Sequence, residues 1–449
     1  MRDEPVTAHT HPDAGPAGFE ISRKQRRNAI SASVLGWSLD LFDLFILLYV
    51  APVIGVLFFP STQPTLSLAA VYASSAVALI IRPLGSAVFG HYADLHGRKG
   101  AMTVALVGTG LSTAAFGLLP TIQQAGYVAP VLFLMLRLVQ GMFIGGVVAA
   151  THTIGTESVS PRWRGTMSGF VGGGAALGAL LAALVFAVVS WIFPGDAFLV
   201  WGWRCMFFSG LLSTALGLFI FGNLEESPYF KQVQVDRRAR KTMAPPVSPL
   251  RALFRPPHRK VLLVNLLITF GGGAAYYLSS GYMPSFLRLV NGLPNGEASK
   301  VLIAASVCAF FASLLVGFIS DFIGRKRAFL LVGILSIVLL PMMFIGMGKG
   351  KDVMSVMPYA LGIAFLGNAA YAPILIFLNE RFPTMLRASG TGLSWNIGFA
   401  IGGLSPTFVS LASNSMADVP RTLAIAVVGV FAVYILGALV VPETKGEFR

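Results

Sequence analysis

Charged residues and cysteine are both scarce in this chain of 449 residues. Asp, Glu, Lys and Arg make up 12% of it, whereas soluble globular proteins carry about 25%. The two cysteines, Cys205 and Cys308, each lie in or beside an apolar stretch. We therefore expect two small buried side chains, and neither a disulfide nor a metal site. The low charge argues against an ordinary soluble globular protein.

Motifs of soluble catalysis are also missing. The sequence contains no G-x-x-x-x-G-K-[ST] loop for nucleotide phosphates, no H-E-x-x-H zinc motif and no cysteine cluster. Residues 1–28 lack the apolar core and the cleavage site of a secretory signal, and they predict a disordered tail. We expect a protein that is not an enzyme and that binds no cofactor and no metal.

The chain is rich in hydrophobic residues, which make up 55% of the sequence. Several apolar runs reach about 20 residues, the length that crosses roughly 30 Å of hydrocarbon. Backbone amides in lipid must be satisfied within the segment, so runs of this length predict helices rather than barrel strands. The sequence therefore predicts an all-α membrane protein, surrounded by the lipid bilayer, with twelve transmembrane helices. The predicted spans are residues 30–54, 69–92, 100–119, 128–151, 166–190, 200–222, 260–287, 299–321, 327–347, 353–379, 386–412 and 420–441.

Basic residues outnumber acidic ones, 33 to 19, and their distribution follows the predicted spans. With an even number of spans both chain ends lie on one side, and most Lys and Arg residues fall on that side, for example Arg98 and Arg237. The opposite loops hold few, among them Arg288 and Lys349. By the positive-inside rule both termini should be cytoplasmic, in a bacterial inner membrane. Because topology accounts for the charge, no nucleic-acid partner is expected.

The longest polar interval divides the predicted helices into two groups of six. Residues 223–259 include a basic stretch and a Pro-rich cluster, which together indicate a cytoplasmic linker. The predicted organisation is then two six-helix bundles, 29–222 and 260–441, with a short cytoplasmic tail at 442–449. Nothing in the sequence demands more than a monomer.

An internal repeat relates the two halves. The loop Gly90-His-Tyr-Ala-Asp-Leu-His-Gly-Arg-Lys99 recurs as Gly317-Phe-Ile-Ser-Asp-Phe-Ile-Gly-Arg-Lys326, with every matched residue at the same spacing. A second pair agrees at nearly the same offset. It consists of Glu157 with Arg164 and Glu380 with Arg387. Two matched pairs predict pseudo-symmetric bundles related by an axis along the membrane normal.

The repeated loop resembles the signature of the major facilitator superfamily. Two other segments are similar to motifs of that superfamily, namely Arg137-Leu-Val-Gln-Gly141 and Pro442-Glu-Thr-Lys-Gly446. Further stretches resemble its metabolite:proton symporters and its sialate/lactate (monocarboxylate) symporters. They are Gly36-Trp-Ser-Leu-Asp-Leu-Phe-Asp43, Arg82-Pro-Leu-Gly85, Trp201-Gly-Trp-Arg204, Glu226-Ser-Pro228 and Arg381-Phe-Pro-Thr-Met-Leu-Arg387. The resemblance implies symport of a small organic anion with protons by alternating access.

The first span contains two carboxylates, Asp40 and Asp43. At spacing i, i+3 they share one helix face, and both fall near the predicted midplane. Ionised carboxylates are costly there, and burial together with mutual repulsion favours a proton on at least one of them. We expect at least one to be a proton-coupling group. The alternative is that an Asp only accepts hydrogen bonds between helices, or pairs permanently with an arginine.

Arg137, at similar depth in the fourth span, is the expected partner of this pair, with Gln140 one turn further on. A guanidinium offers a rigid fork that suits a carboxylate. If the aspartate takes a proton, Arg137 can bind a substrate carboxylate instead, which would couple the two. A permanent Asp–Arg brace is the alternative.

Neutral and aromatic residues predict the rest of the substrate site, and the repeated loops predict the gate. The spans of the second half carry polar or aromatic residues but few charges. This composition suits the uncharged body of a small anion. The alternative is that each aromatic residue serves only packing. The expected substrate ligands from this half are Tyr276, Tyr277, Asn368, Tyr371, Trp395 and Asn396. The expected gating residues, for which solvated turns are the alternative, are Asp94, Arg98, Glu157, Arg164, Asp321, Arg325, Glu380 and Arg387.

Three other classes remain to be weighed. An exporter or exchanger of amphiphilic compounds would share the fold and reverse the direction of transport. A non-transporting membrane sensor would be expected to carry a long signalling extension. A membrane enzyme should show a polar cluster beyond Asp40, Asp43 and Arg137.

Overall fold

The computed structural model describes residues 23–96, 98–157, 161–222, 253–256 and 258–446. The described part of the chain is helical, without strands. Most of the predicted linker 223–259 lies outside the described residues, as does most of the predicted tail 1–28. The first helix begins at Arg23, so it extends into the part of the chain that was expected to be tail.

Twelve transmembrane helices in two six-helix bundles make up the fold, as the sequence predicts. Ten of the spans are long and apolar, the third contains a shorter apolar helix, Thr103–Phe116, and the eleventh is divided into two helices. The first bundle consists of α1 (Arg23–Phe58), α2 (Pro64–His96), α3 (Arg98–Phe116), α5 (Val128–Glu157), α6 (Arg164–Ile192) and a sixth span built from η2 (Phe198–Gly202), α7 (Trp203–Phe208) and α8 (Gly210–Gly222). A short helix, α4 (Ile122–Ala125), connects α3 to α5.

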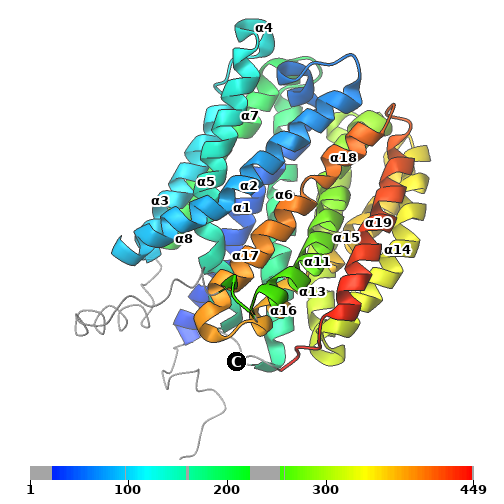
Figure 1. The fold of residues 1–449 in the computed structure, drawn as a ribbon. Helices are drawn as coiled ribbons and strands as arrows, with labels where there is room; N and C mark the ends of the chain where they lie inside the picture. The colour runs from blue at the N-terminus through cyan, green and yellow to red at the C-terminus, as the bar shows by residue number, and fades with distance from the viewer. Residues whose placement is uncertain (1–22, 97, 158–160, 223–252, 257, 447–449) are drawn as a thin grey trace, which may run out of the picture.

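The second bundle repeats this order. Its seventh span combines α11 (His258–Tyr276), η3 (Tyr277–Gly281), α12 (Met283–Ser285) and η4 (Phe286–Val290). The remaining spans are α13 (Asn295–Ile323), α14 (Arg325–Lys349), α15 (Val353–Ala369) with α16 (Ile374–Arg381), α17 (Thr384–Gly402) with α18 (Ser405–Ala412), and α19 (Val419–Val440). In Figure 1 helices α1, α2, α3 and α5 of the first bundle lie to the left of the yellow and red helices α14 and α19 of the second.

The two bundles meet along α6 and α13. Gly169 and Gly317 allow this approach, because a Cβ added to Gly169 would lie 2.4 Å from the Ser313 carbonyl oxygen. A Cβ added to Gly317 would lie 2.6 Å from the Gly165 carbonyl oxygen. Small residues at a helix crossing let backbones pack closely in a membrane, where dispersion replaces the hydrophobic effect.

Besides the eleventh span, which divides between Gly402 and Ser405, two other spans of the second bundle are interrupted. The seventh changes to π-helical geometry over Tyr277–Gly281, and the tenth breaks between α15 and α16. Pro373 directly precedes α16, where its ring and missing amide hydrogen end the α-helical pattern. Irregular backbone at membrane depth is tolerated where it is buried in protein or lines a cavity, so these interruptions indicate where a site lies.

Candidate functional site

Two small cavities lie between the bundles. The first, here called the Arg82 cavity, is lined by Trp37, Leu41, Leu79, Arg82, Tyr276, Tyr277, Tyr371, Trp395, Asn396 and Phe399. The second, here called the alanine chamber, is lined by Phe45, Tyr49, Ala176, Ala179, Tyr276, Ser280, Met283, Leu302, Ala305, Ser306, Ala309, Ala364 and Asn368. Both linings draw on the two bundles, as expected for a central substrate site.

Six of the eight predicted substrate ligands line these cavities. Five belong to the Arg82 cavity, namely Tyr276, Tyr277, Tyr371, Trp395 and Asn396. Asn368 lines the alanine chamber. The other two predicted ligands, Arg137 and Gln140, are part of neither lining, and they are buried inside the first bundle.

Arg82 is the charged residue in the lining of the Arg82 cavity, and it belongs to a buried ion pair. A guanidinium nitrogen of Arg82 in α2 lies 3.6 Å from an Asp40 carboxylate oxygen in α1. Both side chains are buried, and within the described part of the chain the Asp40 oxygens accept no hydrogen bond. A buried pair of this kind is marginal in itself, whereas removing one partner leaves a costly unpaired charge. The pair is therefore suited to exchange its partners.

Arg82, which lines the cavity and pairs with Asp40, is the candidate site residue that the sequence reasoning missed. We singled it out only as the first residue of a family-like segment, although it is a lone charge within the apolar stretch Pro64–Ser86. That isolation was the available signal, because an ionisable residue inside a membrane span is a functional candidate by default. Trp37, also missed, follows Gly36 in the segment that contains the two aspartates.

Of the two aspartates expected beside Arg137, Asp40 pairs with Arg82 instead, whereas Asp43 interacts electrostatically with Arg137. The Arg137 guanidinium donates a 2.6 Å hydrogen bond to Gln140 Oε1, and Gln140 Nε2 donates one of 2.7 Å to Thr113 Oγ1. The guanidinium carbon also lies 4.5 Å from the ring centre of Phe116, a cation–π geometry. Asp43 accepts a 3.4 Å hydrogen bond from Ser213. Matched depth in the sequence was therefore insufficient to select the arginine that pairs with Asp40.

Aromatic side chains fill the space beside the ion pair. Trp37 Nε1 donates a 2.7 Å hydrogen bond to the Tyr371 hydroxyl, which joins α1 to the break in the tenth span. Tyr371 stacks on Tyr276 with ring centres 5.3 Å apart, and Trp395 stacks on Phe399 at 3.9 Å. The cavity therefore presents one cationic group among large, rigid π surfaces.

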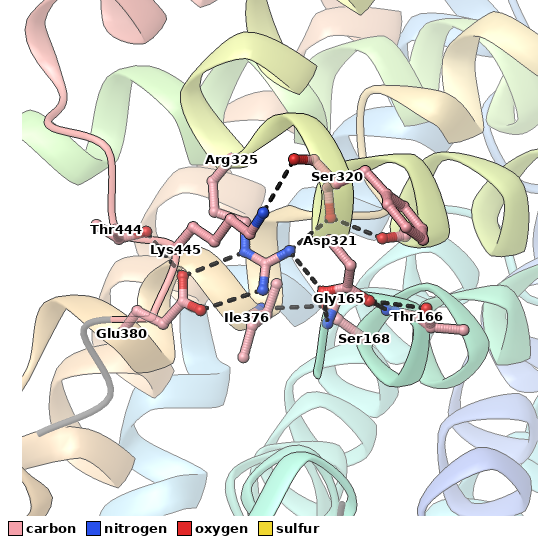
Figure 2. Close-up of polar contacts among 12 residues, drawn as sticks. Gly165, Thr166, Ser168, Ser320, Asp321, Arg325, Ile376, Glu380, Thr444 and Lys445 are labelled. Carbon is pink, nitrogen blue, oxygen red and sulfur yellow. Dashed lines mark hydrogen bonds and ion pairs between the residues drawn. The ribbon is translucent and has the colours of Figure 1, made fainter. Parts of the chain in front are cut away.

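Polar contacts join the bundles at the end of the molecule where α13 ends and α14 begins (Figure 2). Asp321 accepts hydrogen bonds from the backbone amides of Gly165 and Thr166 at the start of α6, at 2.8 and 2.6 Å. A carboxylate is favoured at a helix N-terminus, where the amides are unpaired and the helix dipole is positive. Arg325 pairs with Asp321 at 3.0 Å and with Glu380 at 3.2 Å. Three of the predicted gating residues thus meet in one network.

The chain segment after α19 completes this network. Thr444 donates a 2.7 Å hydrogen bond to Glu380, and Glu443 accepts hydrogen bonds from the backbone amides of Arg325 and Lys326. Arg387 donates instead to the Asn379 carbonyl oxygen. The side chains of Asp94, Arg98 and Glu157 lie outside the described residues, so the equivalent network of the first bundle stays a prediction.

The opposite end of the interface is closed by tyrosines. Tyr72 of α2 stacks on Tyr282 of the seventh span with ring centres 5.1 Å apart, and its hydroxyl donates a 2.8 Å hydrogen bond to Ser285. Tyr282 also shares a 3.0 Å hydrogen bond with Ser410 of α18. The cavities are therefore enclosed between two sets of contacts that join the bundles.

Replacing Asp321 by alanine is expected to loosen the end of the interface that contains this network. The change removes the acceptor of the α6 amides, and each hydrogen bond to a charged group is worth about 1.5–3 kcal/mol. A cysteine introduced at the buried Ser168, in a protein whose Cys205 and Cys308 are serine, should then react roughly tenfold faster with a hydrophilic maleimide. Asp418→Ala serves as the control, since this carboxylate contacts Ser415 at the other end. An unchanged labelling rate would show that the network is a structural contact that does not control access at this end.

Two pseudo-symmetric bundles around enclosed central cavities define a transporter rather than an enzyme. The chain belongs to the major facilitator superfamily, whose sequence profile matches residues 29–406. The expectation that the protein is a multi-pass membrane transporter and no enzyme is therefore confirmed.

Curated relatives cover most of the chain. The inner membrane metabolite transport protein YhjE of Escherichia coli is 29% identical over 391 residues, which span 86% of this chain and 87% of the relative. The glycine betaine/proline/ectoine/pipecolic acid transporter OusA of Dickeya dadantii is 31% identical over 441 residues, 94% and 84% of the two chains. The proline/betaine transporter of Escherichia coli is 30% identical over 412 residues, 90% and 82%. These relatives transport metabolites, and the narrower resemblance to sialate or lactate symporters is not reproduced among them.

Solved structures support the fold. The proton:xylose symporter XylE superimposes with a TM-score of 0.74 at 18% identity, over 95% of this chain and 98% of its own. At this identity the likeness concerns the fold alone.

Proposed function

We propose that this protein is a proton-coupled symporter that imports a small solute bearing a carboxylate, foremost a small organic anion, by alternating access. The observation that carries the proposal is the buried Asp40–Arg82 pair, whose arginine lines a central cavity. The proposed setting is a bacterial inner membrane, with cytoplasmic termini and a monomeric protein.

Coupling follows from the cost of an unpaired buried charge. When Asp40 takes a proton it releases Arg82, and a substrate carboxylate can then occupy the guanidinium. Proton and anion together leave the site as balanced as the original ion pair. Either alone leaves a charge without its partner, which costs about 3–5 kcal/mol when a buried pair is broken. The bundles therefore change conformation readily when the site is empty or holds both the proton and the anion. They do so rarely when only one of the two is bound.

Asp43 and Arg137 form a second polar group outside the linings of both cavities. Asp43 and Arg137 both border the α3 segment that contains Thr113, which accepts the hydrogen bond of Gln140. We assign this group to proton transfer and to positioning α1, while Arg82 takes the substrate role first expected of Arg137. An Arg137→Gln variant that keeps uptake but changes its pH dependence would fit this division.

A zwitterion with a carboxylate is the second candidate substrate. Trp37, Tyr371 and Trp395 line the same cavity as Arg82, and they offer π surfaces of the kind that bind quaternary ammonium groups. Relatives named for glycine betaine and proline add to this candidate. Its carboxylate would still meet Arg82, so both candidates share the same ionic contact.

Uptake into proteoliposomes tests the proposal. Radiolabelled lactate, benzoate, sialate, proline and glycine betaine are offered with and without an inwardly directed proton gradient, with protein-free liposomes as the control. At least one carboxylate solute is expected to accumulate above equilibrium only with the gradient, and a protonophore should abolish the accumulation. Uptake that is unchanged by the proton gradient and by the protonophore would contradict symport. Efflux of amphiphilic compounds driven by the gradient would favour the exporter instead.

A further inference from the structure

Tyr276 separates the two cavities and lines both of them. Its ring is held between neighbours, stacked on Tyr371 and edge-on to Phe45 at 6.1 Å. Its side chain is 1% exposed, and its hydroxyl has no hydrogen-bond partner within the described part of the chain. An unsatisfied buried hydroxyl costs about 1–3 kcal/mol. A fixed phenol with a free hydroxyl at a cavity boundary is therefore suited to a ligand.

The alanine chamber beyond Tyr276 is neutral. Its lining contains no Asp, Glu, Lys, Arg or His, and five alanines present only small side chains to it. Most of its polar groups already have partners. Tyr49 donates to the Ala179 carbonyl oxygen, Ser306 to that of Leu302, and the Asn368 amide to Ser280. A second charge placed there would find no counterion, and its burial would cost several kcal/mol.

We propose that the substrate occupies both cavities, with its carboxylate on Arg82 and an uncharged body in the alanine chamber. Tyr276 donates a hydrogen bond to an oxygen close to the carboxylate. The substrate class is therefore the monocarboxylates with an uncharged chain or ring, 2-hydroxy acids foremost, and dicarboxylates are rejected. This inference rests on the proposed function for the carboxylate end only.

Removing the Tyr276 hydroxyl tests the first contact. Uptake of lactate is compared with uptake of propionate, which lacks the hydroxyl, in the wild type and in Tyr276→Phe. The wild type should prefer lactate, and the variant should lose about tenfold in lactate affinity while propionate affinity stays within twofold, since one hydrogen bond is lost. Equal losses for both solutes, or none, would overturn the role of this hydroxyl.

Filling the alanine chamber tests the second contact. Ala305→Leu places a larger side chain in the chamber, and Ala304→Leu makes the same change on the same helix outside its lining. Competition with radiolabelled lactate is measured for 2-hydroxyhexanoate and for unlabelled lactate. Only Ala305→Leu should weaken the binding of 2-hydroxyhexanoate, by at least about tenfold relative to the binding of lactate. An unchanged ratio between the two acids rejects the two-cavity arrangement.

These outcomes are separate from the fate of the proposed function. If no carboxylate accumulates with a proton gradient in the wild type, symport itself fails. If accumulation occurs but neither variant changes the choice among acids, symport stands and the chamber has no part in selection. Thermal unfolding of each purified variant shows whether a loss of uptake reflects a loss of fold.

Discussion

Replacing Arg82 by glutamine is expected to reduce uptake of the substrate on the order of hundredfold. The change removes the cationic group that faces the cavity and leaves Asp40 buried without its ion-pair partner. Breaking a buried pair on one side costs about 3–5 kcal/mol, and each 1.4 kcal/mol is a factor of ten. Asp40 would hold a proton permanently to avoid that cost, so the site could neither bind the carboxylate nor release its proton. Initial uptake rates in proteoliposomes measure the loss.

Two further variants separate charge from geometry. Arg82→Lys keeps the charge but loses the planar fork, so it should retain a small part of the uptake. Arg421→Gln, at an exposed position at the start of α19, is the matched control and should behave as the wild type. The result that contradicts the assignment is an Arg82→Gln protein with normal uptake beside an inactive Arg137→Gln protein. The substrate carboxylate would then bind Arg137, as the sequence first suggested.

The choice between these two arginines shows where sequence reasoning stops. Apolar runs and charge asymmetry predict the number and order of the helices, because each depends only on length and composition. They also give the depth of a residue along its helix. They do not give the rotation of the helix, which is set by packing against neighbours. Asp40, Arg82 and Arg137 all lie well inside their spans, and only the packed structure shows that α2 turns Arg82 toward Asp40.

The network around Arg325 could be predicted in part from the sequence, and the internal repeat explains why. A motif that occurs twice at matched spacing identifies a structural role from the sequence alone, and Asp321, Arg325 and Glu380 do meet. The contact of Thr444 with Glu380 was not foreseen, because it joins segments far apart in the sequence. Tyr72 and Tyr282 were missed for the same reason.

Replacing Asp40 by asparagine is expected to uncouple transport rather than abolish it. Asparagine imitates the protonated carboxyl in size and charge, so Arg82 stays free to bind a substrate carboxylate. Exchange of labelled for unlabelled substrate across the membrane should therefore continue within a few-fold of the wild-type rate. Accumulation driven by a proton gradient should fall at least about tenfold. The empty transporter can no longer change conformation with a neutral ion pair in its site, because Arg82 has lost its charged partner.

The comparison of Asp40→Asn with Asp43→Asn identifies the carboxyl that carries the proton. Asp43 accepts a hydrogen bond from Ser213 and lies behind the cavity wall, so its replacement should alter the pH at which uptake is half-maximal while leaving some gradient-driven accumulation. Both variants are assayed for exchange and for accumulation in the same vesicles, since only the ratio of the two rates reports coupling. If Asp43→Asn loses accumulation and keeps exchange while Asp40→Asn keeps both, the proton resides on Asp43. The Asp40–Arg82 pair would then be a static brace between α1 and α2, and the exchange of partners at Arg82 could not be the coupling step.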